Sequence, residues 1–176
     1  MDLTIRQEMP QDHPAVFALI QEAFAAEPLS DHREQFLVEW LRRSEAFVPE
    51  LSLVAETDHR IVGHILLTRL KIRSGQDTSE ALALAPVSVL PEYQRRGVGR
   101  RLIRAARERA RTLGYLAVVL VGHADYYPRF GYQPAYRFGI ELPFEVPQEN
   151  SMVVALTEGG LKGVHGKVEY PPEFYE

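Results

Sequence analysis

Two hydrophobic periods recur along the chain, and they predict alternating helices and strands. Alternating or wholly apolar runs are typical of strands, whereas apolar residues spaced three and four positions apart are typical of amphipathic helices. The predicted strands cover residues 3–6, 51–55, 61–72, 81–89, 116–121, 138–142 and 152–156. Helices are predicted to begin at Asp12 and near Ser30–Asp31, and a third to cover residues 98–113. This order of elements indicates a mixed α/β fold.

Local signals add detail to this outline. Thr57–Arg60 is the expected hairpin turn, and Gly63 predicts an interruption or bulge in the strand that follows it. The polar segment 74–79 is expected to be a loop, and the tail 159–176, rich in Gly, Pro and Tyr, to pack irregularly. The second helix is expected to bury Phe36, Leu37, Trp40 and Leu41.

Composition limits the possible functions. The 176 residues suit one domain over 1–176 with one sizeable core. The net charge of −4 argues against general nucleic-acid binding. The chain has no Cys, which excludes disulfides and a Cys nucleophile, and its six His residues lack metal-ligand spacing, so no metal site is expected. The N-terminus is not signal-like, and no apolar run approaches the ~20 residues of a membrane helix, so the cytoplasm is the expected location.

A glycine-spaced turn lies between an apolar strand and an amphipathic helix. Residues 87–99 read Val-Ser-Val-Leu-Pro-Glu-Tyr-Gln-Arg-Arg-Gly-Val-Gly. Such a turn leaves backbone N–H groups unpaired at a helix N-terminus, where the helix dipole adds positive charge. A pyrophosphate fits this environment, because glycines permit its close approach and guanidinium groups add charge. The candidate binding residues in the turn are Gln94, Arg95, Arg96, Gly97, Val98, Gly99 and Arg100.

Two segments in order carry a family resemblance. Gln94 to Gly99 resembles the Gln/Arg-x-x-Gly-x-Gly/Ala signature of the GNAT superfamily of N-acetyltransferases. Asp125–Tyr132 resembles the second signature of that family, in which a Tyr lies four residues before Gly-Phe. The segment Gly122–Tyr127 is similar to a bacterial subgroup of predicted acetyltransferases. One departure is Val121, at a position where many members carry an Asn that contacts the pantetheine arm of the cofactor.

The resemblance covers the whole chain and implies the GNAT fold. That fold has a central mixed, mostly antiparallel sheet flanked by helices, with a V-shaped splay between the fourth and fifth strands, here at Val87 and Val118. Acetyl-CoA is the implied co-substrate, with its pantetheine beside Val87, Ser88 and Val89. A backbone N–H of Val87 or Ser88 is the implied donor to the thioester oxygen. The splay needs a bulge, and Pro86 suits it because proline lacks an N–H.

The implied reaction is direct attack of a primary amine on acetyl-CoA within a ternary complex. The absence of Cys excludes a ping-pong route through acetyl-Cys. Tyr127 aligns with the general acid of the family, and a phenol of pKa ~10 can protonate a leaving thiolate of pKa ~8.5. Tyr126 is its neighbour and competitor, although adjacent helical residues face different ways. The alternative for Tyr127 is a packing role only.

A base is also needed, because a Lys-like amine of pKa ~10.4 must lose a proton before it attacks. His123 is the candidate base, since it follows the strand 116–121, where active-site residues of open α/β sheets gather. A hydrogen-bonding role suits that position equally well. Asp125, Glu80 and His64 are further candidates, with a partly buried, hydrogen-bonded role favoured for His64. A chain of water molecules could replace any of them.

The acceptor site in this fold is usually built by the first two helices, their loop and a later hairpin. Glu27 and Asp31 there hint at a cationic acceptor. The resemblance implies a small-molecule or peptide amine as the partner, and the protein is expected to be a monomer or homodimer. The alternative function is a non-catalytic acetyl-CoA-binding sensor or interaction module. The substitution Tyr127→Phe would distinguish the two, because a binding module has no kcat to lose. The candidate acceptor contacts are Phe24, Glu27, His32, Arg33 and Tyr136.

Overall fold

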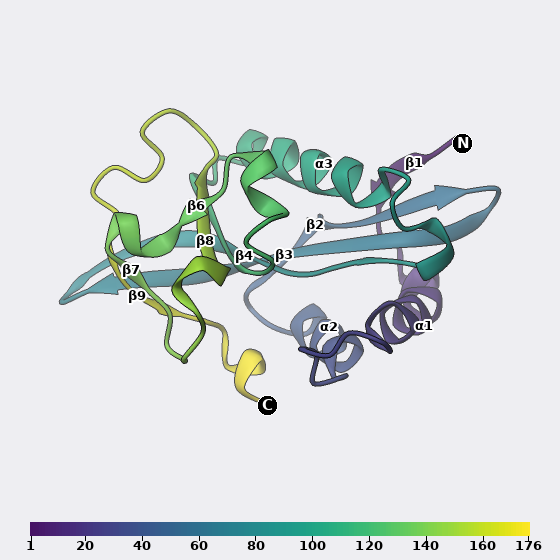
Figure 1. Cartoon of the computed structure of the whole chain (residues 1–176), viewed down its shortest axis with the longest axis horizontal. Coiled ribbons are helices and arrows are strands. Elements are labelled where there is room, and N and C mark those ends of the chain that lie inside the picture. The colour runs from purple at the N-terminus through teal and green to yellow at the C-terminus, as the bar shows by residue number, and fades with distance from the viewer.

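The computed structural model describes residues 1–176 and has a large sheet with helices on both faces (Figure 1). The helices are α1 (His13–Phe24), α2 (Glu34–Arg42) and α3 (Val98–Thr112). The strands are β1 (Thr4–Gln7), β2 (Phe47–Thr57), β3 (Arg60–Ser74), β4 (Asp77–Val89), β5 (Ala117–Val121), β6 (Gln133–Pro134), β7 (Ile140–Glu141), β8 (Ser151–Ala155) and β9 (Gly166–Glu169).

The sheet is mixed but mostly antiparallel. Its strand order is β1-β2-β3-β4-β5-β8-β6, and β9 pairs with both β3 and β7. Only the β4–β5 and β7–β9 pairs are parallel. Helix α3 covers one face, whereas α1 and α2 cover the other (Figure 1). The fold class expected from the sequence is therefore confirmed.

The β2–β3 hairpin follows from its turn residues. Asp58 (φ 50°) and His59 (φ 61°) both have positive φ, as the central residues of a type I′ turn do. The register of the two strands shifts between Ala55 and Glu56, next to Gly63, which confirms the expected bulge. A Cβ atom on Gly63 would lie 2.9 Å from side-chain atoms of α3. This glycine therefore lets the helix pack closely on the sheet.

Strands β4 and β5 are paired over a short distance and then separate. Their paired residues are Leu82 with Val118 and Ala83 with Val119. No residue of β4 beyond Ala83 pairs with β5, so the strands splay as expected. The register of β4 on β3 also shifts close to Pro86, where proline has no N–H to donate to a neighbouring strand.

The second helix differs from its prediction. It begins at Glu34 rather than near Ser30–Asp31, because His32 has a left-handed conformation (φ 59°) that a right-handed helix cannot include. Its buried residues are Gln35, Val38 and Leu41. Phe36 is 40% exposed and packs edge-on against Phe17, so its expected burial is wrong. The buried side of α2 is thus the one that carries Gln35, Val38 and Leu41, and Phe36 lies outside it.

Three other segments also differ from their predictions. Residues 77–79 belong to β4 and not to a loop, because Gly75 (φ 62°) allows a tight turn immediately after β3. The predicted strand 138–142 is reduced to β7, since residues 135–138 form a short 3-10 helix. The tail is not wholly irregular, because it supplies β9. No helix of the structure is both long and apolar enough to cross a bilayer.

Candidate active site

The turn between β4 and α3 forms a concave array of backbone donors. Arg95 (φ 62°) and Gly97 (φ 84°) both have left-handed conformations, and Gly97 immediately precedes α3. None of the N–H groups from Arg95 to Arg100 donates a hydrogen bond to a group of the protein. Successive N–H groups in such a turn, next to a helix N-terminus, create a site for an anion.

The side chains around this turn leave positive charge without a counter-ion. Arg95, Arg96 and Arg100 are exposed, and none of them forms an ion pair with a carboxylate. The Arg96 guanidinium instead lies over the ring of Tyr93, 5.4 Å from its centroid. Backbone donors and guanidinium groups therefore combine at one place, as phosphate recognition requires.

The edge of β4 that faces the splay is unpaired beyond Ala83. Because the Leu90 N–H donates to Val62 O, the alternation of an antiparallel ladder turns the main chain of Ser88 toward β3. The same alternation turns the N–H and C=O groups of Val87 and Val89 toward the open side. Gln94 uses its side-chain amide to donate to Val89 O at 3.1 Å, and it thereby joins the turn to the strand.

Tyr127 is held in a buried aromatic cluster after β5. It is 8% exposed, and its ring packs edge-on against those of Tyr126 and Tyr132. Burial raises the pKa of the Tyr127 phenol well above its ordinary value, and Tyr126 raises it further. A Cβ atom on Gly122 would overlap the Tyr127 ring. The hydroxyl therefore stays protonated, and a glycine fixes where the ring lies.

Two contributions of this region were not predicted from the sequence. The side-chain amide of Asn150 donates to Gly122 O at 2.9 Å, and the main-chain carbonyl of Asn150 accepts the Gly122 N–H. These two bonds hold the segment before Tyr127 in place. The Tyr126 hydroxyl lies 3.4 Å from where a Cβ of Gly99 would be, next to the anion-binding turn. Neither contact leaves a signal in a local sequence motif, because each joins distant segments.

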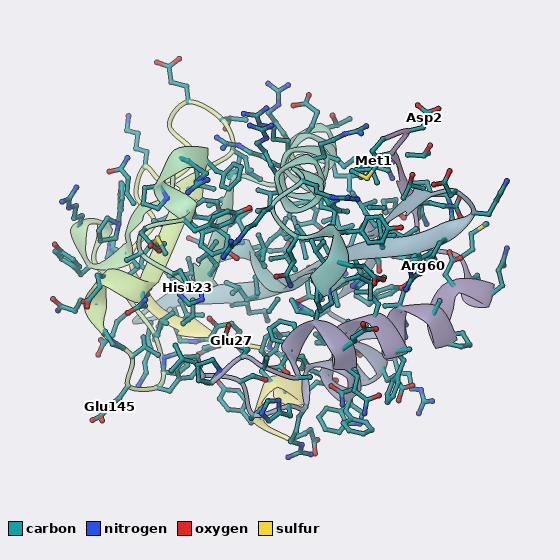
Figure 2. The ribbon with its side chains drawn as sticks, turned by 45° about the vertical axis from the view of Figure 1, so that its right-hand side comes forward. Met1, Asp2, Glu27, Arg60, His123 and Glu145 are labelled. Carbon is teal, nitrogen blue, oxygen red and sulfur yellow. The ribbon has the colours of Figure 1, made fainter.

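His123 lies in the turn that follows β5. Its side chain is 61% exposed, and its Nε2 atom is 4.0 Å from a carboxylate oxygen of Glu27 in the segment after α1. Figure 2 shows the two side chains facing each other across the gap between these segments. The contact brings together a candidate base from the turn after β5 and a candidate acceptor residue from the segment after α1.

The other candidate bases occupy different places. Glu80 pairs with Lys71 and precedes the short β4–β5 pairing, so it lies on the side away from the splay. Asp125 is exposed in the same turn as His123. His64 is fully buried and belongs to a separate polar cluster with Glu8.

That polar cluster explains the state of His64. Its Nε2 atom lies 3.1 Å from Ser52 Oγ and 3.3 Å from a Glu8 carboxylate oxygen. Burial lowers the pKa of His64, although the hydrogen bond to Glu8 acts in the opposite direction. Glu8 in turn accepts hydrogen bonds of 2.9 and 2.8 Å from Arg42. His64 is thus a hydrogen-bonded residue, as favoured from the sequence, although it is fully rather than partly buried.

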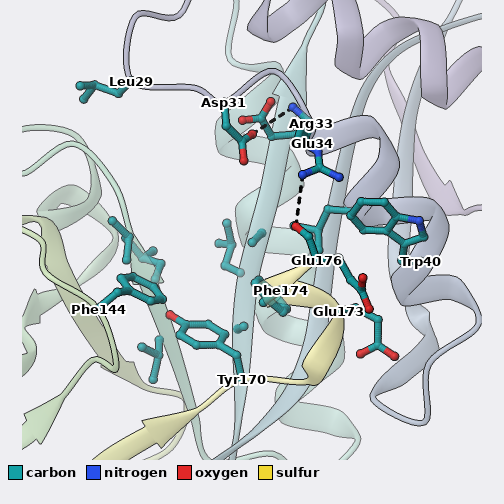
Figure 3. Close-up of a pocket in the computed structure, with 17 residues that line it drawn as sticks. Leu29, Asp31, Arg33, Glu34, Trp40, Phe144, Tyr170, Glu173, Phe174 and Glu176 are labelled. Atoms are coloured by element: carbon teal, nitrogen blue, oxygen red, sulfur yellow. Dashed lines mark hydrogen bonds between the residues drawn. The ribbon is translucent and has the colours of Figure 1, made fainter.

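A cavity of about 410 Å³ opens beside the splay on the face covered by α2 (Figure 3). We call it the α2-side cavity. Of the candidate acceptor contacts, Arg33 lines it. Phe24 and His32 line a separate hollow beside α1, and Tyr136 is exposed on the short helix 135–138. No group of three or more His, Asp or Glu side chains is arranged to hold a metal ion.

A sheet that splays beside a helix N-terminus is the architecture that the resemblance to the GNAT acetyltransferases implies. Residues 4–135 match the acetyltransferase (GNAT) domain family. The chain therefore belongs to the GNAT superfamily and is an acyltransferase.

Relatives of known sequence agree with this assignment. The uncharacterized N-acetyltransferase YjhQ of Escherichia coli is 43% identical over 119 residues, which cover 67% of this chain and 66% of that protein. The uncharacterized N-acetyltransferase YhbS of the same organism is 30% identical over 173 residues, 98% of each chain.

Solved structures extend the likeness to the fold. The crystal structure of YhbS from Escherichia coli in complex with CoA has a TM-score of 0.88 at 27% identity and covers 99% of this chain and 92% of that one. A GNAT family acetyltransferase from Brucella melitensis in complex with acetyl-CoA has a TM-score of 0.81 at 32% identity over 98% of each chain.

Proposed function

We propose that this protein transfers the acetyl group of acetyl-CoA to a primary amine by direct attack within a ternary complex. The observation that carries the proposal is the run of free N–H groups from Arg95 to Arg100, which continues from the unpaired edge of β4. A pyrophosphate fits the free N–H groups of the turn. The amides of a pantetheine arm fit the unpaired edge of β4, where they would bond as an added strand does. The complexes of the two structural neighbours with CoA and acetyl-CoA support this choice of co-substrate.

The residues of the splay have complementary tasks in this reaction. The Val87 N–H points to the open side and suits the role of donor to the thioester oxygen, where negative charge develops. The amine nitrogen forms a bond to the carbonyl carbon as the carbon–sulfur bond breaks. Tyr127 gives its proton to the departing thiolate, and His123, held by Glu27, takes the proton that the amine loses.

Calorimetry with acetyl-CoA, free CoA and NAD tests the proposal. The test variant is Gly97→Trp, which places a bulky side chain on the anion-binding turn. The matched control is Gly75→Trp, because Gly75 also has positive φ and lies in a hairpin turn with open space around it. Both substitutions carry the strain of a non-glycine residue at positive φ, of the order of 1 kcal/mol.

Micromolar binding of acetyl-CoA by the wild type and the Gly75 variant, lost in the Gly97 variant and absent for NAD, is the expected result. Equal acetyl-CoA affinity in all three proteins would contradict the placement of the pyrophosphate on this turn. Failure of the wild type to bind any CoA species would refute the proposed function itself.

A further inference from the structure

The α2-side cavity has an apolar floor that reaches the splay. The floor consists of Ala83–Ala85 of β4 and Val119–Val121 of β5, the residues at which the two strands separate. Its volume of about 410 Å³ lies within the range of ~300–1,000 Å³ that is usual for small-molecule sites. A molecule in this cavity would contact the splay from the face opposite α3, next to the place that we propose for the thioester.

The opposite end of the cavity is acidic. Asp31 lines it from the segment before α2, and Glu34 from the first residue of that helix. Glu173 and Glu176 line it from the C-terminal segment (Figure 3). Arg33 is the only basic residue among the lining side chains. Three aromatic rings form a wall of the cavity. Phe144 stacks on Tyr170 with their ring centroids 5.5 Å apart, and the centroids of Tyr170 and Phe174 are 4.7 Å apart.

These carboxylates are not neutralised within the protein. Neither Asp31, Glu34 nor Glu173 forms an ion pair, and a carboxylate oxygen of Glu173 is buried without a hydrogen-bond partner. Buried polar atoms are usually paired, so an unpaired one at a cavity needs a donor from elsewhere. An ammonium group supplies both the donors and the charge that this end of the cavity lacks.

From this arrangement we infer that the acceptor is an aliphatic diamine, in which an apolar spacer separates the reacting amine from a second, cationic amine. The inference rests on the proposed function and adds the substrate class. The reacting amine would lie against the apolar floor, where removal from water lowers the pKa of an amine and favours its neutral, nucleophilic form. The second amine would stay charged between Asp31 and Glu173.

Arg33 provides the opposing case that an experiment must address. Its guanidinium lies over the ring of Trp40, 5.3 Å from the centroid, and donates to the main-chain oxygen of Glu176 at 3.3 Å. A carboxylate on the acceptor would bind Arg33 if this residue dominated the cavity. We favour the cation because the lining residues include four carboxylate side chains and one guanidinium, and because the guanidinium already has an aromatic partner.

Three acceptors with the same reacting end separate these cases: hexamethylenediamine, hexylamine and ε-aminocaproate. They present an ammonium, a methyl group and a carboxylate to the acidic end. CoA release at saturating acetyl-CoA gives kcat/KM for each acceptor. We expect the diamine to exceed hexylamine at least about 10-fold, since several weakly screened charges act together, and ε-aminocaproate to be the poorest acceptor.

The double variant Asp31→Asn/Glu173→Gln tests the residues directly. It should reduce the ratio of kcat/KM for the diamine to that for hexylamine about 10-fold, mainly by lowering the value for the diamine. Glu158→Gln is the control, because Glu158 is exposed, has no ion-pair partner and does not line the cavity. A preference that survives in the double variant, or a preference for ε-aminocaproate, would overturn the inference.

Calorimetry of acetyl-CoA, measured on the same samples, separates the two levels of the argument. Normal acetyl-CoA binding with no turnover of the diamine would overturn the diamine inference alone. Loss of acetyl-CoA binding in the wild type would overturn the proposed function and, with it, the inference.

Discussion

The substitution Tyr127→Phe tests the proposed general acid with little disturbance of the fold. The ring is 8% exposed and keeps its contacts with Tyr126 and Tyr132 after the hydroxyl is removed. No side chain or backbone group of the protein bonds that hydroxyl, so its removal leaves no partner unsatisfied. We therefore expect the free energy of unfolding to change by less than about 1 kcal/mol.

The effect on the rate should be much larger. A positioned general acid contributes about 100-fold to 10,000-fold, so kcat should fall at least about 100-fold, or about 2.7 kcal/mol of transition-state stabilisation. The affinity for acetyl-CoA should remain within about threefold, because the hydroxyl acts only as the thiolate leaves. Steady-state assays of CoA release, with calorimetry of acetyl-CoA, measure the two quantities separately.

Tyr132→Phe is the matched control. Tyr132 is 5% exposed, packs on the same cluster and, like Tyr127, has a phenol pKa that burial raises. Its variant should keep kcat within about threefold of the wild type. Equal losses in the two variants, or a loss below about threefold for Tyr127→Phe, would refute the assignment of Tyr127 as the acid.

The pH dependence supplies a second test of the same assignment. Burial raises the pKa of Tyr127, so the phenol remains protonated as the pH increases through its ordinary value of ~10. The activity that depends on this proton is present below the raised pKa and is lost only above it. An alkaline decline of kcat that is centred below pH ~9 and disappears in Tyr127→Phe would contradict this prediction.

Three further predictions concern other parts of the structure. Glu8→Gln should destabilise the protein by about 3–5 kcal/mol in denaturant titrations, because it leaves Arg42 buried without its carboxylate. Glu56→Gln is the comparison: it removes a partly exposed ion pair and should cost less than about 1 kcal/mol. Burial would raise the pKa of Glu8, but its hydrogen-bonded partners lower it to about 2, so its stabilisation should be complete above pH ~4.5 and be lost as the pH falls toward 2, which thermal unfolding at several pH values measures. Gly122→Ala should lower kcat toward that of Tyr127→Phe by displacing the ring, and an unchanged kcat would show that the ring has room to adjust.

The turn, strand and helix of the candidate cofactor site could be predicted because their information is local. The glycines at 97 and 99, the strand before them and the amphipathic helix after them all lie within one continuous segment. The proposal for Tyr127 likewise rests on one short motif, and its role stays a prediction. The end of the β4–β5 pairing at Ala83 also has a local signal, because Pro86 and the register shift follow in the same strand.

The candidate acceptor site could not be predicted in the same way, because its parts come from distant segments. The Glu27–His123 contact joins residues almost a hundred positions apart, and the α2-side cavity combines α2 with the C-terminal segment. The buried face of α2 also depends on tertiary packing, since the apolar Phe36 is exposed and stacks on Trp40, which lines the cavity. No periodic pattern can distinguish an apolar residue that lines a cavity from one that fills the core.

The free N–H groups between Arg95 and Arg100 have an evolutionary consequence. Every residue except proline supplies the same N–H, so substitutions in this turn can accumulate while the groups that would hold the co-substrate persist, provided that the glycines remain. The acidic end of the α2-side cavity has the opposite property, because each of its contributions is a particular side chain. A few substitutions there would alter the range of amines while the transfer chemistry stays the same. A lineage of such proteins can therefore diversify in its acceptors without having to reinvent its acyl donor.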